Sequence, residues 1–388
     1  MGNNFPTARM RSIKMSGGIR EILSRANELE GLGRDIIHME IGRPDFDSPL
    51  CAKEAAIQAL KNGDVHYTDM SGTMELRSAL GNKYARDNAM EIDPANQIVV
   101  TSGAIEALAA TFLTLLEPED ELIIPTPYFA AYADQVAIAG GSVVEVPTTI
   151  ENGFRVQIDD IKAALTNKTK AILINTPNNP SGAVLTYKDL EDIAKLAIDH
   201  DIWVISDECY EKFLYEGEHI SIASLPGMAE KTITISAASK TWSMTGWRIG
   251  WAIVPAAIKP YITKCHQNLS TCANSFAQAG VAAVITEADD AISVMIDEYK
   301  RRRDMVISQL NQVKCFDVTI PSGAFYAFPK ITRSGMSSMD MSQMLLEKAG
   351  VATVPGDVFG APGHIRLAYC RSYDYLCEGL RRIRTLLP

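Results

Sequence analysis

Four segments of the chain place a polar side chain or a tight turn directly after a β-rich run. They are TSGAIEAL with Gly103, NTPNNPSG with Asn179, SDECYEKF with Asp207, and SAASKTWSMTGWRIGW with Lys240. A lysine with a lowered pKa can add to an aldehyde and hold it as an imine, and a buried carboxylate needs a cationic partner. A helix that opens after a strand directs backbone N–H groups at an anion. These residue types therefore suit covalent catalysis through an amine beside an anion site.

Each of these residues also has an ordinary structural interpretation. Lys240 taken alone would be a solvated surface lysine, because lysine side chains are mostly exposed. Asp207 could be a helix N-cap, and Asn178 and Asn179 could simply shape a Pro-Gly turn. A Ser-Gly-Ala turn by itself indicates nothing. The functional interpretation therefore depends on the order and spacing of the whole set.

In that order and spacing, Asn179, Asp207, Lys240 and Arg248 resemble the fold-type I aminotransferases, the class I/II family that depends on pyridoxal phosphate and includes aspartate and aromatic aminotransferases. The likeness covers nearly the whole chain. It extends to GRPDFDSP near the start, the Tyr67 segment with GTMELR after it, PSGAFY, and HIRLAY near the end. The resemblance implies an α/β fold, in which a large domain with a mainly parallel, doubly wound sheet is joined to a smaller α+β domain.

The resemblance implies that Lys240 carries pyridoxal 5′-phosphate as an internal Schiff base, within the frame S-x-x-S-K-T-x-x-M-T-G-W-R. Once substrate displaces it, Lys240 would move the proton between the substrate Cα and the cofactor C4′. Asp207 would pair with the protonated pyridine nitrogen, which keeps the ring an electron sink. Tyr210 and Asn179 would hydrogen-bond the cofactor O3′ and tune the pKa of the imine.

Three sources of positive charge or N–H groups are expected to bind the cofactor phosphate. They are the backbone N–H groups of Gly103, Ala104 and Ile105 at a helix start and the bidentate fork of Arg248; the resemblance adds the phenol O–H of Tyr67, which in the family reaches the neighbouring active site. This family role of Tyr67 makes a homodimer part of the prediction. A surface salt bridge for Arg248 and a core position for Tyr67 are the alternatives.

The substrate is expected to bind on the other side of the cofactor. Arg366 in HIRLAY resembles the family arginine that pairs bidentately with the substrate α-carboxylate. Gly42 and Phe325 resemble positions in the substrate-side wall, Asn179 borders the substrate as well as the cofactor, and Asn175 joins the polar network. A turn glycine, core packing and a strand-end cap are the alternatives for Gly42, Phe325 and Asn175.

Two further positions need a choice between neighbouring residues. Phe129 in PTPYF aligns with the family aromatic that stacks on the cofactor ring, although a register shift of one would put Tyr128 there. Ala237 stands where many family members have a phosphate-binding serine. Either Ser236 or Ser239 could take that role, and the sequence does not decide between them.

Ile105 stands where some aspartate-using relatives have a lysine that binds the distal carboxylate of the substrate. Isoleucine cannot form that ion pair, so we predict no selectivity for dicarboxylates by this device. An apolar or aromatic substrate side chain is expected to be accommodated instead. A preference for aspartate over leucine, methionine and phenylalanine of well over tenfold would contradict this prediction, since it needs about 1.4 kcal/mol of differential transition-state binding.

Short β-rich runs alternate with helical patterns through the middle of the chain, which is typical of a doubly wound sheet. The predicted strands are residues 98–101, 122–124, 143–146, 171–174, 203–206, 232–235 and 249–254, and helical spacing is found at 106–116, 129–139 and 187–200. Ligands of such a sheet collect at the C-terminal ends of the strands.

The last hundred residues differ in character from the middle of the chain. A charged helix around residues 298–310 precedes the apolar SGAFYAF run, a Met-rich helix, and a closing strand and helix. We therefore predict three parts. Residues 1–45 pack with the small domain, residues 46–285 form a large cofactor-binding domain, and residues 286–388 form the small C-terminal domain.

Composition narrows the possible partners. A chain of 388 residues exceeds what one core usually serves, and 37 basic against 47 acidic residues, without a run of one sign, argue against nucleic acid. Seven scattered cysteines and six dispersed histidines predict reduced thiols and no metal site. The N-terminus lacks the apolar core of a signal peptide and residues 105–116 are too short a span, so we expect a cytoplasmic protein without a membrane association.

The hypothesis is reversible transamination by a ping-pong mechanism, in which an amino acid leaves its α-amino group on the cofactor and a second 2-oxo acid collects it. One alternative is a pyridoxal-phosphate-dependent carbon–sulfur β-lyase, racemase or synthase, since the same contacts support several fates of one carbanion. A non-enzyme alternative is an aminotransferase-like effector-sensing module of a transcription regulator. The few dozen residues before GRPDFDSP leave no room for its helix-turn-helix domain.

Overall fold

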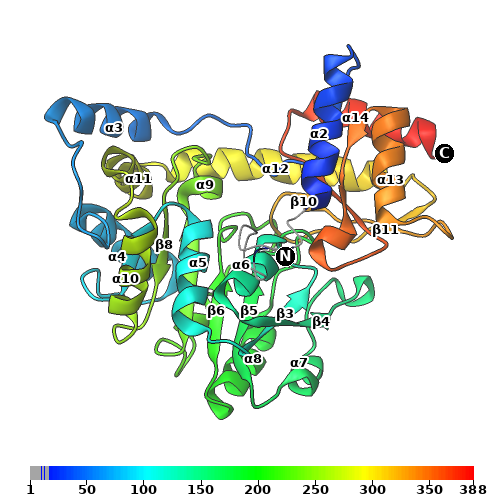
Figure 1. Ribbon diagram of the computed structural model, residues 1–388. Helices are drawn as coiled ribbons and strands as arrows, with labels where there is room; N and C mark the ends of the chain where they lie inside the picture. Colours follow the sequence, from blue (N-terminus) through cyan, green and yellow to red (C-terminus); the bar gives the residue numbers. More distant parts are fainter. Residues whose placement is uncertain (1–9, 11–12, 14–16) are drawn as a thin grey trace, which may run out of the picture.

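The computed structural model describes residues 10, 13 and 17–388. Figure 1 shows a larger lobe built around a twisted sheet and a smaller lobe that contains α2 (Gly17–Gly31), α13 (Ser338–Met344) and α14 (Tyr373–Leu386). The predicted N-terminal part, residues 1–45, therefore lies partly outside the described residues.

A seven-stranded sheet forms the centre of the larger lobe. In spatial order its strands are β2 (Ile98–Thr101), β8 (Gly250–Ile253), β7 (Thr232–Ala237), β6 (Trp203–Asp207), β5 (Thr169–Asn175), β3 (Glu121–Thr126) and β4 (Ser142–Pro147). Only β8 runs antiparallel to its neighbours. All seven predicted strands are present, and the mainly parallel α/β fold is confirmed.

Helices cover both faces of this sheet, as parallel strands require. The helices of the larger lobe are α3 (Leu50–Asn62), α4 (Met74–Asn88), α5 (Ala104–Leu115), α6 (Ala131–Ala139), α7 (Ile158–Ala164), α8 (Tyr187–Asp199), α9 (Ala238–Thr241), α10 (Lys259–Ser270) and α11 (Ser275–Glu287). Of these, α3 packs on α11 away from the sheet, and α9 is a single turn at the end of β7. One core packs α5, α6 and α10 on the sheet, and another packs α7 and α8 on it. The strands β6 and β7 between them are buried almost throughout, because both faces are covered.

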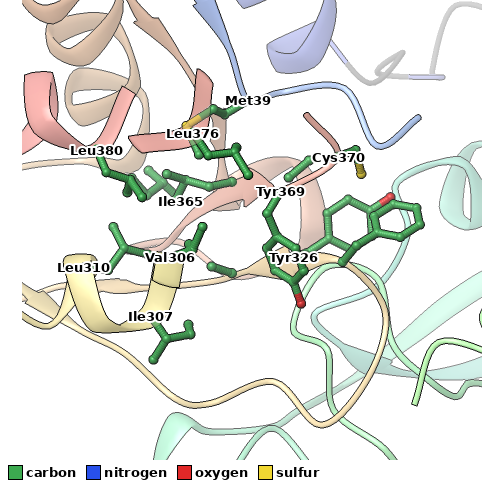
Figure 2. Packing of buried hydrophobic residues seen from close by; sticks show 14 of the residues in the cluster. Met39, Val306, Ile307, Leu310, Tyr326, Ile365, Tyr369, Cys370, Leu376 and Leu380 are labelled. Atoms are coloured by element: carbon green, nitrogen blue, oxygen red, sulfur yellow. The ribbon is translucent and has the colours of Figure 1, made fainter. Parts of the chain in front are cut away.

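The smaller lobe contains short strands around an apolar core. The strand β14 (Ile365–Ala368) lies between β10 (Tyr326–Ala327) and β13 (Val354–Pro355), β11 (Lys330–Ile331) pairs with β9 (Phe316–Asp317), and short helical turns complete the lobe at η3 (Leu345–Ala349) and η4 (Gly356–Phe359). Figure 2 shows part of this core, where Ile365 and Leu376 face Val306 and Leu310.

One long helix, α12 (Asp289–Leu310), belongs to both lobes (Figure 1). Ile292 packs in the core of the larger lobe, whereas Val306 and Leu310 pack in the core of the smaller lobe. The helix begins about nine residues before the charged pattern that predicted it. Asp289 and Asp290 in its first turn favour a start there, because acidic groups stabilise a helix N-terminus.

The described part of the N-terminal segment packs on the smaller lobe. Ile22 and Leu29 of α2 share a small core with Leu346 and Ala352. The strand β1 (Ile37–His38) pairs in parallel with β12 (Val351–Ala352). The exact division at residues 45 and 285 stays a prediction, because α12 joins the two lobes without a break.

The ends of three strands position the site. Asn175, Asp207 and Ala237 are the last residues of β5, β6 and β7, which are adjacent parallel strands, so the groups that follow them meet at one edge of the sheet.

Within residues 17–388, no helix combines the length and apolar character that a membrane crossing requires.

Candidate active site

A cavity of about 360 Å³ lies at this edge of the sheet, between the two lobes. Its walls include ten of the residues predicted from the sequence, namely Gly42, Ala104, Ile105, Phe129, Asn179, Asp207, Tyr210, Lys240, Arg248 and Arg366. The folded chain thus brings together groups that are more than 300 residues apart in the sequence.

Lys240 enters the cavity from α9, the short helix that follows β7. Its Nζ donates a hydrogen bond of 2.7 Å to the carbonyl oxygen of Gly42. Burial lowers the pKa of the Lys240 ammonium below its ordinary value, because a low-dielectric surrounding disfavours the charged form. A lowered pKa makes the free, nucleophilic amine easier to reach near neutral pH.

Asp207 ends β6 and is only 6% exposed. Its carboxylate accepts hydrogen bonds from the Tyr132 hydroxyl at 2.6 Å and from the Cys209 backbone N–H at 3.1 Å. Burial raises the pKa of Asp207 above its ordinary value, although these bonds oppose the shift. Among the described residues it forms no ion pair, so its charge would be stabilised by a cation placed in the cavity.

Tyr210 lies one turn beyond Asp207, with its phenol buried beside the cavity. Its hydroxyl is 2.9 Å from the hydroxyl of Tyr326, on β10 of the smaller lobe. Burial raises the pKa of Tyr210 well above its ordinary value, so the phenol stays protonated and can donate a hydrogen bond. Tyr210 therefore offers a neutral donor at the junction of the two lobes.

Arg366 projects from β14 and is 4% exposed. Its Nη1 donates to Asn179 Oδ1 at 2.9 Å and its Nη2 donates to the Glu40 carbonyl at 2.6 Å, while its Nε has no partner among the described residues. The guanidinium also lies over the rings of Tyr326 and Phe359, at 4.6 and 4.8 Å. A buried guanidinium held only by neutral groups can bind an anion.

Asn175 and Asn179 form the support for this arginine. The Asn175 amide donates to the Asp207 carbonyl at 3.0 Å, and its Oδ1 accepts from the Asn179 backbone N–H at 2.8 Å. Asn175 also lines the cavity, as its place in the expected polar network suggested. The two asparagines therefore connect the end of β6 to Arg366.

A second anion-binding corner lies at the start of α5. Gly103 has a φ of 86°, and a Cβ at this position would lie 2.4 Å from Nη2 of Arg248, so only glycine allows the arginine to approach the helix so closely. Arg248 donates to the carbonyls of Thr245 and Ser102 at 2.9 and 3.3 Å. Its charge has no carboxylate partner among the described residues. The guanidinium and the helix N-terminus together suit a phosphate.

The structure separates neighbouring residues that the sequence could not distinguish. Phe129 lines the cavity, whereas Tyr128 turns away and donates a 2.7 Å hydrogen bond to Glu145. Ser239 also lines the cavity, while Ser236 lies near the carbonyl of Glu208 on another side of β7. Phe129 and Ser239 are therefore the members of each pair placed to touch a ligand.

Three predicted site residues do not line the cavity. Gly103 is one of them, although the next residue, Ala104, lies in the wall. Phe325 is fully buried in the smaller lobe's core, where its ring packs edge-on against Tyr210 and Phe213 at 5.3 and 5.0 Å. Its neighbour Tyr326 takes the wall position instead, because successive residues of an extended segment face opposite sides. Tyr67 is 83% exposed in the loop between α3 and α4, outside the cavity of its own chain.

Sequence reasoning missed several wall residues, among them Tyr132, Tyr326 and Glu40. Tyr132 lies in the first turn of α6, three residues after Phe129, and its ring contacts the Phe129 ring edge-on at 5.6 Å. Tyr326 could have been found by reading the alternation of the SGAFYAF run. Glu40, two residues before Gly42, gives no signal in the sequence, since a buried acid is recognised only when its surroundings are known.

Comparison with known proteins identifies the family. Residues 34–383 match the family model for aminotransferases of class I and II. The chain is 41% identical over 374 residues to aromatic-amino-acid aminotransferase 2 of Thermococcus litoralis, with 95% of each chain covered. It is 43% identical over 359 residues to the aspartate aminotransferase of Pyrococcus abyssi, with 91% of this chain and 92% of that one covered.

Solved structures agree with the sequence comparison. The Thermus thermophilus aspartate aminotransferase with maleate is similar to this chain with a TM-score of 0.95 at 37% identity, covering 99% of this chain and 100% of that one. The order of the site residues along the chain, the fold that gathers them and the similarity over nearly the full length all agree. This chain belongs to the class I and II aminotransferases, a family of fold-type I transferases that depend on pyridoxal phosphate.

Proposed function

We propose that this enzyme transfers the α-amino group of an amino acid to a 2-oxo acid by a ping-pong mechanism, with pyridoxal phosphate held on Lys240. The observation that carries the proposal is the pairing of a lowered-pKa lysine with a buried arginine that lacks an acidic partner, in one cavity. The lysine supplies an amine for the cofactor, and the arginine supplies a site for the substrate carboxylate.

The groups around the cavity fit each part of the cofactor. Asp207, buried without a cation, suits a protonated ring nitrogen. Tyr210 offers a phenol donor, and the amide of Asn179 lines the same cavity. The corner formed by Gly103 and Arg248 suits the phosphate. When bound, the protonated pyridine ring supplies an electron sink for the pair of electrons left on the substrate Cα.

The remaining steps fall to side chains of this chain. The Nζ of Lys240, once freed by the incoming amino group, would take the proton from the substrate Cα and would deliver it to the cofactor carbon that Lys240 itself had held. Arg366 fixes the α-carboxylate so that the Cα–H bond stays within reach of that nitrogen. Phe129 supplies an aromatic surface on one side of the cavity.

The substrate side chain meets an apolar opening. Ile105 at the start of α5 is 38% exposed and lines the cavity together with Ile41 and Leu108. Relatives of this chain are an aspartate aminotransferase and an aromatic-amino-acid aminotransferase. We propose that this enzyme accepts apolar and aromatic amino acids at rates within about tenfold of aspartate, because no described cation stands at Ile105 to favour a distal carboxylate.

We further propose a homodimer in which Tyr67 completes the phosphate site of the neighbouring subunit. Tyr67 and the nearby Val65 are 83% and 54% exposed in the loop after α3, an unusual position for large apolar groups on a surface that stays in water. A Tyr67→Phe variant should bind pyridoxal phosphate about tenfold more weakly while keeping the dimeric mass of the wild type. Unchanged cofactor affinity would contradict this role of Tyr67.

A panel of amino donors and oxo acids tests the function. The cofactor spectrum would be followed in single turnovers with aspartate, phenylalanine, leucine and methionine. Conversion to the pyridoxamine form, reversed by a 2-oxo acid, supports transamination, whereas release of pyruvate with return of the starting spectrum supports a β-lyase. Lys240→Ala should abolish the conversion. Lys231→Ala is the matched control, since Lys231 lies just before β7 and pairs with the exposed Asp201.

A further inference from the structure

A line of contacts connects the N-terminal helix to Arg366. Glu30 of α2 lies 3.1 Å from Nε2 of His38, and Nδ1 of His38 lies 2.6 Å from Oε1 of Glu40. The backbone carbonyl of Glu40 then accepts the 2.6 Å hydrogen bond from Nη2 of Arg366. His38 thus lies between two carboxylates. It is two residues before Glu40, whose backbone carbonyl accepts the hydrogen bond from Arg366.

The two contacts favour a doubly protonated His38. Ionised carboxylates only accept hydrogen bonds, and only the imidazolium has an N–H group to donate to each of them. The hydrogen bond to Glu40 raises the pKa of His38 above its ordinary value, with a smaller contribution from Glu30, although partial burial opposes the shift. His38 therefore carries positive charge to a higher pH than a solvated histidine would.

The groups that face His38 come from three elements. Glu30 belongs to α2, Glu40 to its own segment, and Tyr375 to α14, where the phenol oxygen accepts the His38 backbone N–H at 2.8 Å. The adjacent strand β12 presents only Val351 and Ala352. Among the described residues His38 is the only ion-pair partner of the Glu40 carboxylate, while the nearby Arg366 bonds the Glu40 backbone carbonyl.

Glu40 depends on His38 for charge compensation. It is fully buried, it lines the cavity, and its Oε2 has no hydrogen-bond partner among the described residues. Loss of the His38 proton would leave a carboxylate uncompensated beside the cavity, which costs several kcal/mol unless the segment moves or the group is protonated. The same segment carries Gly42, where even a Cβ would lie 1.9 Å from the Tyr326 hydroxyl, so there is little room for movement.

We propose that His38 is a positioning residue for substrate binding. As an imidazolium between Glu30 and Glu40, it holds the Glu40 backbone against Arg366 and keeps the wall beside the substrate carboxylate free of net negative charge. This inference rests on the proposed role of Arg366 as the carboxylate site.

The direction of the pH effect follows from the charges. Below the pKa of His38 the pair with Glu40 is neutral, and Arg366 attracts the substrate carboxylate without opposition. As the pH rises through that pKa, the wall gains one negative charge, and the KM for the amino acid rises. The value of kcat should change little, because His38 and Glu40 do not reach the reacting atoms.

The test compares pH profiles of KM and kcat from pH 6 to 9 in the holoenzyme, with the donor that ranks first in the panel above. The variants are His38→Gln, Glu40→Gln and the double variant, and His200→Gln is the control because His200 is exposed at the end of α8. We expect His38→Gln to raise KM roughly tenfold at pH 6.5, the size of one uncompensated charge near an ion-binding site, with kcat within about twofold.

Rescue separates the proposed role from a purely structural one. In the double variant the uncharged amide that replaces the Glu40 carboxylate needs no cation, so KM should return to within about threefold of the wild type and should lose its dependence on His38 titration. A double variant as impaired as His38→Gln would overturn the proposal, as would a His38→Gln profile that overlays the wild type. The Arg366→Lys variant tests separately whether Arg366 binds the substrate carboxylate. An unchanged KM in that variant would contradict the proposed function, whereas the His38 variants test the role of His38.

Discussion

Two groups of buried charged residues differ in how completely they are paired. On one side, Lys83 of α4 donates to Glu211 at 2.5 Å, and His219 contacts Glu208 at 2.9 Å. On the other side, Lys240 and Arg366 line the cavity and have only neutral hydrogen-bond partners among the described residues. The first group resembles a closed ion-pair network, and the second is a binding site.

The closed group satisfies nearly all of its polar atoms. Asn88 donates to Glu211 and to Ser221 at 2.9 and 2.8 Å, and Ser221 donates to Glu208 at 2.5 Å. Despite burial, the Lys83 and His219 charges hold the pKa of Glu211 below its ordinary value. Glu208, Glu211 and His219 lie within 4.8 Å of one another, as metal ligands do, but the Lys83 ammonium already supplies positive charge there.

The comparison teaches that burial of charge does not by itself indicate function. A buried carboxylate with a lysine beside it stabilises the fold only weakly but becomes very costly if its partner is removed. A buried arginine with only neutral partners is tolerated because a ligand compensates it. The difference predicts opposite outcomes when a cation is removed from each group.

The largest effect is expected for Lys240→Ala. Without the amine, proton transfer at Cα loses its base, so kcat for transamination should fall by about 10⁴-fold, the upper range for a general acid–base group. In the apoenzyme the unfolding temperature should stay level or rise, because the substitution removes a desolvated amine that has no charged partner among the described residues. A clear loss of apoenzyme stability would contradict the view that Lys240 has no charged partner in the fold. Calorimetry and steady-state kinetics give both values.

Removal of Lys83 should have the reverse effect. Lys83 is 1% exposed, so Lys83→Met leaves the Glu211 carboxylate buried and unpaired. The free energy of unfolding should fall by about 3–5 kcal/mol, measured by urea titration, while kcat/KM of the folded enzyme stays within a few-fold. Lys83→Met combined with Glu211→Leu should recover much of this loss. If the double variant recovered no stability, the Lys83–Glu211 pair would not be the cause of the loss.

Arg366→Lys should give a smaller effect, confined to binding. Lysine keeps the charge but loses the planar fork that matches a carboxylate, so KM for the amino acid should rise by about 30-fold, equivalent to about 2 kcal/mol. The unfolding temperature should change by little, since the partners of Arg366 are the neutral Asn179 and the Glu40 carbonyl. A fall in kcat without a change in KM would argue against carboxylate binding.

The smallest effect concerns the pH dependence of the closed group. Burial lowers the pKa of His219, but the charge and hydrogen bond of Glu208 outweigh it and raise that pKa above the ordinary value. The stabilisation that the protonated His219 gains from Glu208 is therefore fully present below the pKa of histidine in the unfolded chain. It is lost as the pH rises through the pKa of His219 in the folded protein. We expect a decline of about 1 kcal/mol in unfolding free energy. His219→Gln should flatten the curve in that range.

The sequence predicted the sheet and most of the groups at its edge. The β-rich runs mark β5, β6 and β7, Asp207 ends β6, and Asn179 and Lys240 lie shortly after β5 and β7. Local pattern placed these residues at strand ends, and the ordered set with its family resemblance gave them their roles. Parallel strands then bring such groups together without further information. The family resemblance supplied Arg366, whose position could not follow from the large domain's pattern.

The remaining contacts depend on tertiary packing. The bonds of Tyr132 to Asp207 and of Tyr326 to Tyr210 join residues that are 75 and 116 positions apart. No periodicity specifies such pairs. The line from Glu30 to Arg366 depends on how α2 lies on the smaller lobe, which sequence pattern fixes only weakly. Ion pairs in general carry no local signature, because either partner alone looks like a surface residue.

The helix α12 couples the melting of the two lobes. Ile296 near its middle packs against the cores of both, with Ile292 on one side and Val306 on the other. If one lobe unfolded alone, the apolar residues at one end of α12 would lose their packing partners. Helices in proteins are stabilised mainly by such packing. Heating should therefore unfold both lobes in one cooperative transition, so that the enzyme has a single unfolding temperature.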